Sequence, residues 1–247
     1  METRLEKGPI VIQGAMQSEL QTLLENMDSQ KKVTVGELVF YECIYKDFPI
    51  IISKTKIGEI ASAIATTVAI QRYEPALVIN QGTAGALVRW LHRGDIVVGK
   101  EIYYISQYST EPDKEEDIIN PWKRDGYRTK DGEALSYKAN EELIALLESM
   151  EHLKKDGVYF DIIASGDVWT KSRNLMERYN SLYGVVCEAM ECSGAYLAAS
   201  TFGTPLVSLR VISNNEITGE AFDEETGAIA QMAALRIIDR LILKHSF

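Results

Sequence analysis

The sequence predicts an α/β fold, in which a mixed and largely parallel central sheet carries helices on both faces. Apolar runs of strand length alternate with segments of helical periodicity along all 247 residues, which is the pattern of a sheet built from strand–helix units. No internal repeat, linker or low-complexity tract divides the chain. We therefore expect a single domain over residues 1–247, with residues 1–8 as a flexible N-terminal extension.

The predicted strands are short apolar runs rich in β-branched residues. The segment 33–55 alternates in polarity and has turn signals at Gly36 and Asp47, so it predicts two or three strands rather than one. The other runs are more uniformly apolar, as expected of parallel strands that are buried on both faces. In chain order, the predicted strands lie at 9–12, within 33–55, at 76–79, 94–105 and 158–163, and on both sides of a helix within 184–215.

The predicted helices have apolar residues at spacings of three and four, or many small residues that permit close packing. Ser18 and Asn140 are typical capping residues at the start of two of them. In chain order, the helices span 18–27, 59–73, 141–153, 171–179, 190–202 and 223–244. Residues 106–131 differ, because they are polar, contain two prolines and carry the acidic run EPDKEED, which predicts a long surface loop.

Charge and composition narrow the function classes. A net charge of −10 argues against a general nucleic-acid binder, which needs a basic surface. No apolar run is long enough for a membrane-spanning helix, and the polar N-terminus METRLEKGPI is unlike a signal peptide. The three cysteines are too few and too scattered for a disulfide framework or a zinc cluster. We expect a cytoplasmic globular protein with neither a nucleic-acid nor a membrane partner.

Five predicted strand ends carry small or polar residues. In a largely parallel sheet such ends meet along one edge, where ligands bind. A glycine at any one of them can also serve only to permit a tight turn. The five ends are 14–16, 82–85, 165–167, 188–191 and 213–214. Together they predict one crevice lined by carboxylates, an amide and backbone N–H groups.

Several side chains at this crevice suit a small ligand. Glu19 follows the first strand, where it can act as a general base or merely stabilise the start of a helix. Glu191 lies among small apolar residues, and a buried carboxylate needs a partner such as ligand hydroxyls or Arg210. The Thr83 hydroxyl and its neighbouring N–H groups can bind a water, a phosphate or a sugar hydroxyl. The three histidines lie elsewhere and no dinucleotide or triphosphate motif occurs, so a Ser-His-Asp or zinc mechanism has no support.

The strand-end motifs occur together in one known order. They are PIVIQGAM at 9–16 followed by Glu19, KIG at 56–58, VINQGTAG at 78–85, GDIVV at 94–98, ASGD at 164–167, AME at 189–191 and RVIS at 210–213. With this set, the chain resembles the purine nucleoside phosphorylase/nucleosidase superfamily over residues 9–243, and within it the 5′-methylthioadenosine/S-adenosylhomocysteine nucleosidases. The resemblance implies a phosphorylase/hydrolase-like fold, a homodimer, no metal or organic cofactor, and a small-molecule purine nucleoside as substrate.

The resemblance also implies a reaction and the residues that perform it. The N-glycosidic bond is hydrolysed through an oxocarbenium-like ribosyl transition state, which releases the free purine and a (thio)ribose. Glu19 orients or deprotonates the water, Glu191 binds the 2′- and 3′-hydroxyls of the ribose, and Trp169 stacks on the base. Asn214 takes the position of the acid that protonates N7 of the leaving purine. The other implied substrate-binding residues are Met16, Ile57, Thr83 (usually serine in the family), Ala84, Gly85, Met190 and Phe222, and the implied supporting residues are Arg210 and Ser213.

Asn214 departs from the nucleosidase pattern, which has aspartate at this position. An amide cannot act as an acid at neutral pH, but it donates one hydrogen bond and accepts another, which suits a 6-oxopurine. The alternative substrate is therefore a 6-oxopurine nucleoside of inosine or futalosine type. Ala189 is a second departure, since the family often has glutamate there. Glu188 precedes it by one residue, which reverses the facing of a side chain in a strand, so we do not assume that Glu188 substitutes.

Two further alternatives concern the reaction itself. Phosphorylases of this superfamily have an arginine where this chain has Asn80, and another near Gly14 that has no counterpart here. A phosphate dianion would be poorly held without those cations, so water is favoured as the nucleophile over a purine nucleoside phosphorylase reaction. A catalytically weak nucleoside-binding homologue is the remaining alternative, motivated by Asn214 alone. The glutamates at 19 and 191 favour an enzyme over such a binding protein.

Overall fold

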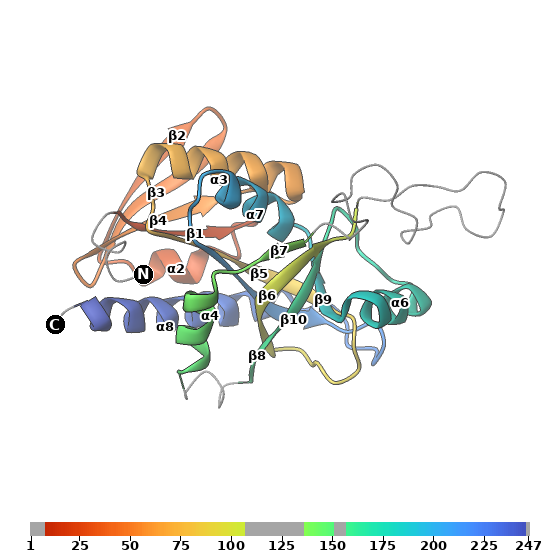
Figure 1. Ribbon diagram of the computed structural model, residues 1–247. Helices are drawn as coiled ribbons and strands as arrows, with labels where there is room; N and C mark the ends of the chain where they lie inside the picture. Colours follow the sequence, from red (N-terminus) through yellow and green to blue (C-terminus); the bar gives the residue numbers. More distant parts are fainter. Residues whose placement is uncertain (1–7, 107–135, 151–156, 246–247) are drawn as a thin grey trace.

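A computed structural model describes residues 8–106, 136–150 and 157–245 of the chain (Figure 1). The flexible extension predicted over 1–8 and the surface loop predicted over 106–131 lie outside these residues, apart from Gly8 and Ser106. The predicted α/β fold, with helices on both sides of a mixed sheet, is confirmed.

One continuous sheet forms the centre of the molecule. Its strand order is β10-β6-β8-β9-β5-β1-β4-β3-β2, and β7 pairs with β6. Because β10 also pairs with β5, the strands β5, β10, β6, β8 and β9 close on themselves into a small barrel, from which the other strands extend as an open sheet. The strands are β1 (Ile10–Gly14), β2 (Ser29–Val35), β3 (Leu38–Tyr45), β4 (Phe48–Lys54), β5 (Leu77–Ala86), β6 (Ile96–Tyr104), β7 (Ser136–Lys138), β8 (Val158–Ser165), β9 (Val185–Ala189) and β10 (Leu206–Asn214).

The strand pairings in the described part of the chain are evenly mixed, with five parallel and five antiparallel. The parallel neighbours β4, β1, β5 and β10 form the middle of the sheet. Antiparallel pairs arise from the hairpins of β2, β3 and β4, from β7, and from the two contacts that complete the barrel. The prediction of a mixed sheet is confirmed, but parallel pairings are half of those described rather than most of them, because the hairpins, β7 and the two contacts that complete the barrel are antiparallel.

Helices cover both faces of the sheet (Figure 1). On one face, α3 (Glu59–Tyr73) and α7 (Cys192–Thr201) pack side by side, and on the other α8 (Gly227–His245) lies with α2 (Gln21–Glu25). Gly194 permits the close approach of α3 and α7, because a Cβ there would lie only 2.1 Å from the backbone oxygen of Glu59. The remaining helical segments are α4 (Glu141–Glu148), α6 (Arg173–Tyr183) and the 3-10 turn η1 (Glu224–Thr226).

The first helix is much shorter than predicted. Residues 18–20 form a turn, α2 begins only at Gln21, and no side chain caps it. Other groups hold the turn. The backbone N–H of Glu19 donates to the carbonyl oxygen of Met16 (3.2 Å). The buried side-chain amide of Gln231 in α8 donates to the carbonyl oxygen of Ser18 (2.8 Å). Glu19 therefore lies buried in a turn before the helix, rather than solvated in the first helical turn.

Two stretches predicted to follow strands belong to the strands themselves. β5 continues through the glycine-rich segment to Ala86, and β10 continues to Asn214, because the two strands pair with each other over this length. The helix predicted at 171–179 spans Arg173–Tyr183. It begins after Ser172, because the Ser172 side chain caps it by accepting from the backbone N–H of Leu175. The backbone of Ser213 and Asn214 belongs to β10, which pairs with β5, so the strand ladder fixes where these two polar side chains begin.

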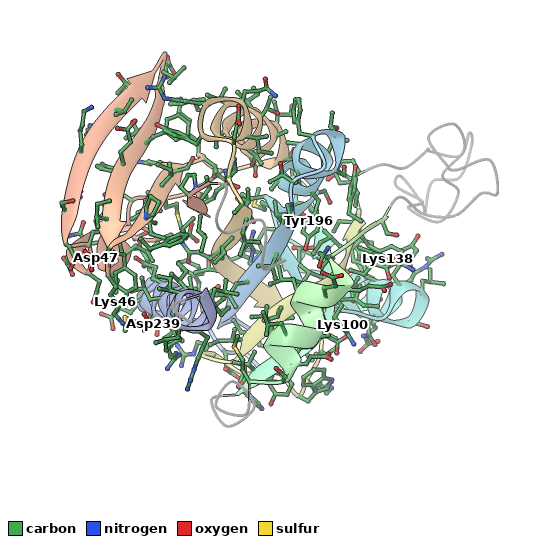
Figure 2. All side chains as sticks on the ribbon, turned by 60° about the vertical axis from the view of Figure 1, so that its left-hand side comes forward. Lys46, Asp47, Lys100, Lys138, Tyr196 and Asp239 are labelled. Atoms are coloured by element: carbon green, nitrogen blue, oxygen red, sulfur yellow. The ribbon has the colours of Figure 1, made fainter. Side chains whose placement is uncertain are left out.

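The turn between β3 and β4 is tied to the last helix. Lys46 and Asp47 both have positive φ angles (49° and 61°), the geometry of a two-residue hairpin loop, so the predicted turn is confirmed. The ammonium group of Lys46 lies 2.6 Å from the Oδ1 atom of Asp239 in α8, and Figure 2 shows these side chains together. This contact is part-exposed and anchors the outer hairpin on the side of α8.

Candidate active site

A cavity of about 210 Å³ is lined by residues of β5, β9 and β10 and by the segments that follow β1 and β8. It brings together every residue that the sequence assigns to substrate binding or to the reaction. These lining residues are Met16, Glu19, Ile57, Thr83, Ala84, Gly85, Trp169, Met190, Glu191, Ser213, Asn214 and Phe222. Arg210 lies behind the lining and reaches it through Glu191.

The Glu19 carboxylate accepts four hydrogen bonds. Its Oε2 atom accepts from the backbone N–H groups of Ala15 (2.8 Å) and Met16 (3.2 Å). Its Oε1 atom accepts from the backbone N–H of Thr83 (3.0 Å) and from the Thr83 hydroxyl (3.3 Å). A Cβ at Gly82 would lie 2.8 Å from Oε1, so glycine leaves the space that the carboxylate occupies. The three backbone N–H groups hold the carboxylate in one position, and a water that takes the place of the longer contact with the Thr83 hydroxyl can be oriented by Glu19 or give it a proton.

Glu191 lies immediately before α7 and lines the same cavity. Its Oε1 atom accepts from the backbone N–H of Gly58 (3.3 Å), and its Oε2 atom lies 3.9 Å from the Nη2 atom of Arg210. Burial raises the pKa of Glu191, and the positive charge of Arg210 offsets part of that effect. A carboxylate has about four lone-pair sites, so Glu191 can still accept from two hydroxyls of a ligand.

Arg210 is fully buried and has a supporting position. Its guanidinium donates to the carbonyl oxygens of Asn80 (2.8 Å) and Leu209 (2.9 Å), and to the side-chain oxygen of Asn80. The sequence left open whether Arg210 pairs with Glu191 or only supports the fold, and the structure gives it both contacts. The Asn80 side chain is turned toward Arg210 and does not line the cavity.

The rim of the cavity is apolar and aromatic. Ile57, Trp169 and Phe222 line it and are each about half exposed. The rings of Trp169 and Phe222 lie 5.7 Å apart, tilted by 60°. Phe222 belongs to the segment between β10 and η1, which leads into the last helix. Such a rim offers flat apolar surface to a purine and to the substituent of a nucleoside.

The two consecutive asparagines after Ser213 have different surroundings. Asn215 is buried, and its amide nitrogen donates to the carbonyl oxygens of Val88 (2.9 Å) and Leu91 (2.8 Å), so it fixes a loop. Asn214 lines the cavity, with its Oδ1 atom 3.1 Å from the Ser213 hydroxyl. Within the described part of the chain, the Asn214 amide nitrogen has no acceptor, so its two N–H groups can donate to a ligand.

Glu188, in the predicted strand end 188–191, also lines the cavity, although no role was predicted for it. Glu188 is buried, and its two oxygens accept from the backbone N–H (2.7 Å) and the hydroxyl of Thr170. Burial raises the pKa of Glu188, and these two bonds offset part of the effect. Glu188 and Ala189 are consecutive residues of β9 and both line the cavity, so the facing argument for a regular strand does not exclude Glu188. Ala15 and Ala189, from the predicted strand ends 14–16 and 188–191, also line the cavity, and the lining residues that were not predicted are Ala86, Leu87, Val168, Thr170 and Met176.

A further buried carboxylate supports the cavity from behind. Glu59, at the start of α3, accepts from the hydroxyl of Ser165 and from the backbone N–H of Gly194 in α7. The Asp167 carboxylate accepts from the backbone N–H of Glu59 (2.9 Å). The predicted strand end 165–167 therefore connects α3 and α7 instead of lining the crevice. Burial raises the pKa of Glu59 to about 7.

Two absences hold for the residues that the structure describes. No group of three or more histidine, cysteine, aspartate or glutamate side chains is placed to hold a metal ion in 8–106, 136–150 and 157–245. Over the same ranges, no helix combines the length and apolarity needed to cross a membrane.

The fold and the cavity together define a protein of the nucleoside phosphorylase type. Residues 9–243 match the Phosphorylase superfamily, and the chain belongs to this family. It is similar to the 5′-methylthioadenosine/S-adenosylhomocysteine nucleosidase of Bacillus subtilis (strain 168), with 27% identity over 94% of this chain and 99% of the relative. The enzyme of the same name from Anoxybacillus flavithermus is 28% identical over 92% of this chain and 93% of its own.

Solved structures agree with this class. A futalosine hydrolase mutant of Helicobacter pylori strain 26695 superimposes with a TM-score of 0.79 and 25% identity, over 94% of this chain and 99% of that one. A Neisseria meningitidis 5′-methylthioadenosine/S-adenosylhomocysteine nucleosidase in complex with methylthio-immucillin-A gives a TM-score of 0.78 at 23% identity, with the same coverage. The latter likeness concerns the fold, which is confirmed as phosphorylase/hydrolase-like.

Proposed function

We propose that this protein hydrolyses the N-glycosidic bond of a purine nucleoside with a 5′-thio or other 5′ extension, releasing the free purine and a (thio)ribose. The observation that carries the proposal is the presence of Glu19 and Glu191 in one cavity, each held by protein hydrogen bonds or charge, beside an aromatic rim. The relatives named 5′-methylthioadenosine/S-adenosylhomocysteine nucleosidases support this substrate class.

The two carboxylates have complementary roles in this reaction. Glu191 accepts hydrogen bonds from the 2′- and 3′-hydroxyls and places negative charge near the ribose, where positive charge develops in an oxocarbenium-like transition state. Glu19 holds the attacking water together with the Thr83 hydroxyl, and takes its proton. The apolar rim of Ile57, Trp169 and Phe222 covers the base and the 5′ substituent.

Water is the proposed nucleophile because the cavity offers little to a phosphate dianion. No lysine or arginine lines the cavity within the described residues. Arg210 is engaged with Asn80 and Glu191, and Asn80 stands where the related phosphorylases have arginine. Phosphate binding normally requires charge-assisted bonds from such cations.

Two purine classes are candidates for the base. The named relatives support adenine, as in 5′-methylthioadenosine. Asn214 supports a 6-oxopurine, because its amide is not an acid that could protonate N7 but can donate a hydrogen bond to the exocyclic O6 atom. The likeness to a futalosine hydrolase supports the second class as well.

A panel of nucleosides tests the proposal. Base release is measured for adenosine, inosine and their 5′-methylthio derivatives, each with and without inorganic phosphate. The proposal predicts release that does not depend on phosphate and is faster for the 5′-methylthio compounds. Release that requires phosphate would instead support a phosphorylase. Binding of a nucleoside without release of base would support a catalytically weak homologue.

The proposal includes a homodimer formed through α3 and α7. Ile60 and Ile64 lie one turn apart on α3 and are 74% and 53% exposed, and Leu197 on the adjacent α7 is 52% exposed. Exposed apolar side chains on paired helices are typical of an interface. Sedimentation should give a dimer that Ile64→Glu dissociates. Leu243→Glu, on the exposed part of α8, is the matched control, and a monomeric wild type would contradict the proposal.

The remaining parts of the proposal are a mechanism without metal or organic cofactor and a cytoplasmic location. The three cysteines are free and buried, which is in keeping with a reducing compartment. Full activity after dialysis against a chelator is the expected result, and loss of activity that added metal restores would contradict it.

A further inference from the structure

We propose that Glu188 is a specificity-determining residue, which together with Asn214 reads the N1–H and O6 edge of a 6-oxopurine. This inference rests on the proposed nucleosidase function and specifies its base. Glu188 stands outside the family motif that identifies Glu191, and the structure places it in the lining of the cavity.

The sheet places Glu188 and Asn214 on either side of one glycine. Gly85 in β5 is the register partner of Glu188 in β9 and also of Asn214 in β10. Residues directly opposite one another on neighbouring strands share a face, and all three line the cavity. With strands about 4.8 Å apart, the backbones of Glu188 and Asn214 are separated by roughly 10 Å. The Asn214 amide lies beside Gly85, since a Cβ there would be 3.4 Å from its nitrogen, so this amide and the Glu188 carboxylate flank the strand position that has no side chain.

Glu188 lines the cavity as an acceptor whose two oxygens are both held by Thr170. Thr170 donates to one oxygen through its backbone N–H and to the other through its hydroxyl. An ionised carboxylate accepts at about four positions, so each oxygen keeps capacity for a ligand N–H. The two bonds from Thr170 also fix the plane of the carboxylate, so a donor on the base meets a defined acceptor.

Asn214 offers the opposite polarity on the other side of Gly85. Its carbonyl oxygen lies 3.1 Å from the Ser213 hydroxyl, while its amide nitrogen has no acceptor within the described residues. The amide can therefore donate to an oxygen or nitrogen lone pair of a bound base. The pair thus presents one fixed acceptor and one available donor across the cavity.

A 6-oxopurine matches this pair, and a 6-aminopurine does not. The 6-oxo ring has a donor at N1 and an acceptor at O6, so N1–H meets Glu188 and O6 meets Asn214. Adenine has a lone pair at N1, which would face the Glu188 carboxylate without a proton between them. A site whose buried polar groups are left without partners discriminates strongly, and we expect a preference of about 10²-fold in kcat/KM.

The test is the ratio of kcat/KM for inosine over adenosine, and for the corresponding 5′-methylthio pair, in the wild type and in Glu188→Gln. The wild type should favour the 6-oxopurine by about 10²-fold. Glu188→Gln should reduce or invert this ratio, because an amide can donate to N1 of adenine. Thr170→Val, which removes one bond that orients Glu188, should lower the ratio, and Thr170→Ser, which keeps the hydroxyl, should restore it.

Each outcome separates the two levels of the proposal. No release of base from either class would overturn the nucleosidase function itself. Release with a preference for adenosine, or a ratio unchanged by Glu188→Gln, would overturn the role of Glu188 and leave hydrolysis intact. If Glu188→Gln does not fold, the wild type is tested with 6-methoxypurine ribonucleoside, which has oxygen at C6 but no N1–H. Turnover equal to that of inosine would overturn the inference, and turnover at least tenfold lower would support it.

Discussion

The ribose end and the base end of the cavity differ in how completely the protein engages their polar groups. At the ribose end, Glu19 accepts four protein hydrogen bonds and Glu191 is placed by Gly58 and Arg210. At the base end, Glu188 accepts from one residue only, and the Asn214 amide nitrogen has no acceptor in the described part of the chain. The first end is organised before substrate binds, and the second is completed by substrate.

This difference separates rate from selectivity. Fixed groups aimed at the developing charge stabilise a transition state without reorganisation, so changes at the ribose end should lower the rate for every substrate. Groups with unused hydrogen-bonding capacity distinguish one base from another, so changes at the base end should alter ratios between substrates. The predictions below test this separation.

Glu19→Gln should have the largest effect. It removes the general base, so kcat should fall by about 10²–10⁴-fold for every substrate. The amide also places N–H groups against protein donors, so the melting temperature should fall by a few degrees while the protein stays folded. Steady-state kinetics and thermal melting measure both. Glu25→Gln on the exposed side of α2 is the matched control, and a fully active Glu19→Gln would remove Glu19 from the mechanism.

Glu59 should make stability depend on pH. Its pKa is raised from 4.5 to about 7 by burial, so the folded state binds a proton more tightly than the unfolded state does. The resulting stability is present below about pH 4.5 and is lost as pH rises through about 7. Its full size is about 3 kcal/mol. Denaturant titrations from pH 4 to 8 (roughly the window of this shift) should show a larger loss in the wild type than in Glu59→Gln, in which Glu188 and Glu191 still contribute a loss of the same sign. Parallel pH profiles would contradict it.

Glu191→Gln should lower kcat/KM for a ribonucleoside by about 10- to 100-fold, since it removes charge-assisted bonds to two hydroxyls. The loss should be smaller for the 2′-deoxynucleoside, which lacks one of those hydroxyls. Comparing the two substrates in the wild type and the variant isolates the contact. An equal loss for both would place the effect of Glu191 elsewhere than on the 2′-hydroxyl.

Asn214→Asp should have the smallest effect on total activity but change its distribution. An aspartic acid can protonate N7 and accept from the amino group of adenine, whereas an aspartate faces O6 unfavourably. We expect kcat/KM to rise for 5′-methylthioadenosine and to fall for 5′-methylthioinosine, roughly tenfold each. Parallel changes for both substrates would show that the base end does not act as a selectivity element.

The ribose end was the more predictable of the two from sequence. Glu19 and Glu191 lie in ordered motifs at strand ends, and a carboxylate among small apolar residues requires a partner whatever the details of the fold. Arg210, within an apolar strand, could be assigned as that partner for the same reason, and the structure places it 3.9 Å from Glu191.

The base end depends on features that local sequence does not encode. Glu188 lies in the predicted strand end 188–191, but no residue pattern shows that its carboxylate accepts from Thr170 and lines the cavity next to Ala189. The turn at residues 18–20, which contains Glu19, was predicted as the start of a helix because Ser18 is a typical capping residue. The distant residue Gln231, from α8, instead bonds to the backbone of that turn, and such long-range contacts override local preference.

The most direct test of the central claim identifies the sugar product formed in saturating inorganic phosphate. A nucleosidase that binds water at Glu19 should yield only free (thio)ribose and the purine, in equal amounts and at a rate that phosphate does not change. The same assay with Glu19→Gln should yield neither. Formation of a sugar 1-phosphate, or release of base that rises with phosphate concentration, would contradict hydrolysis and with it the assignment of Glu19 to a water.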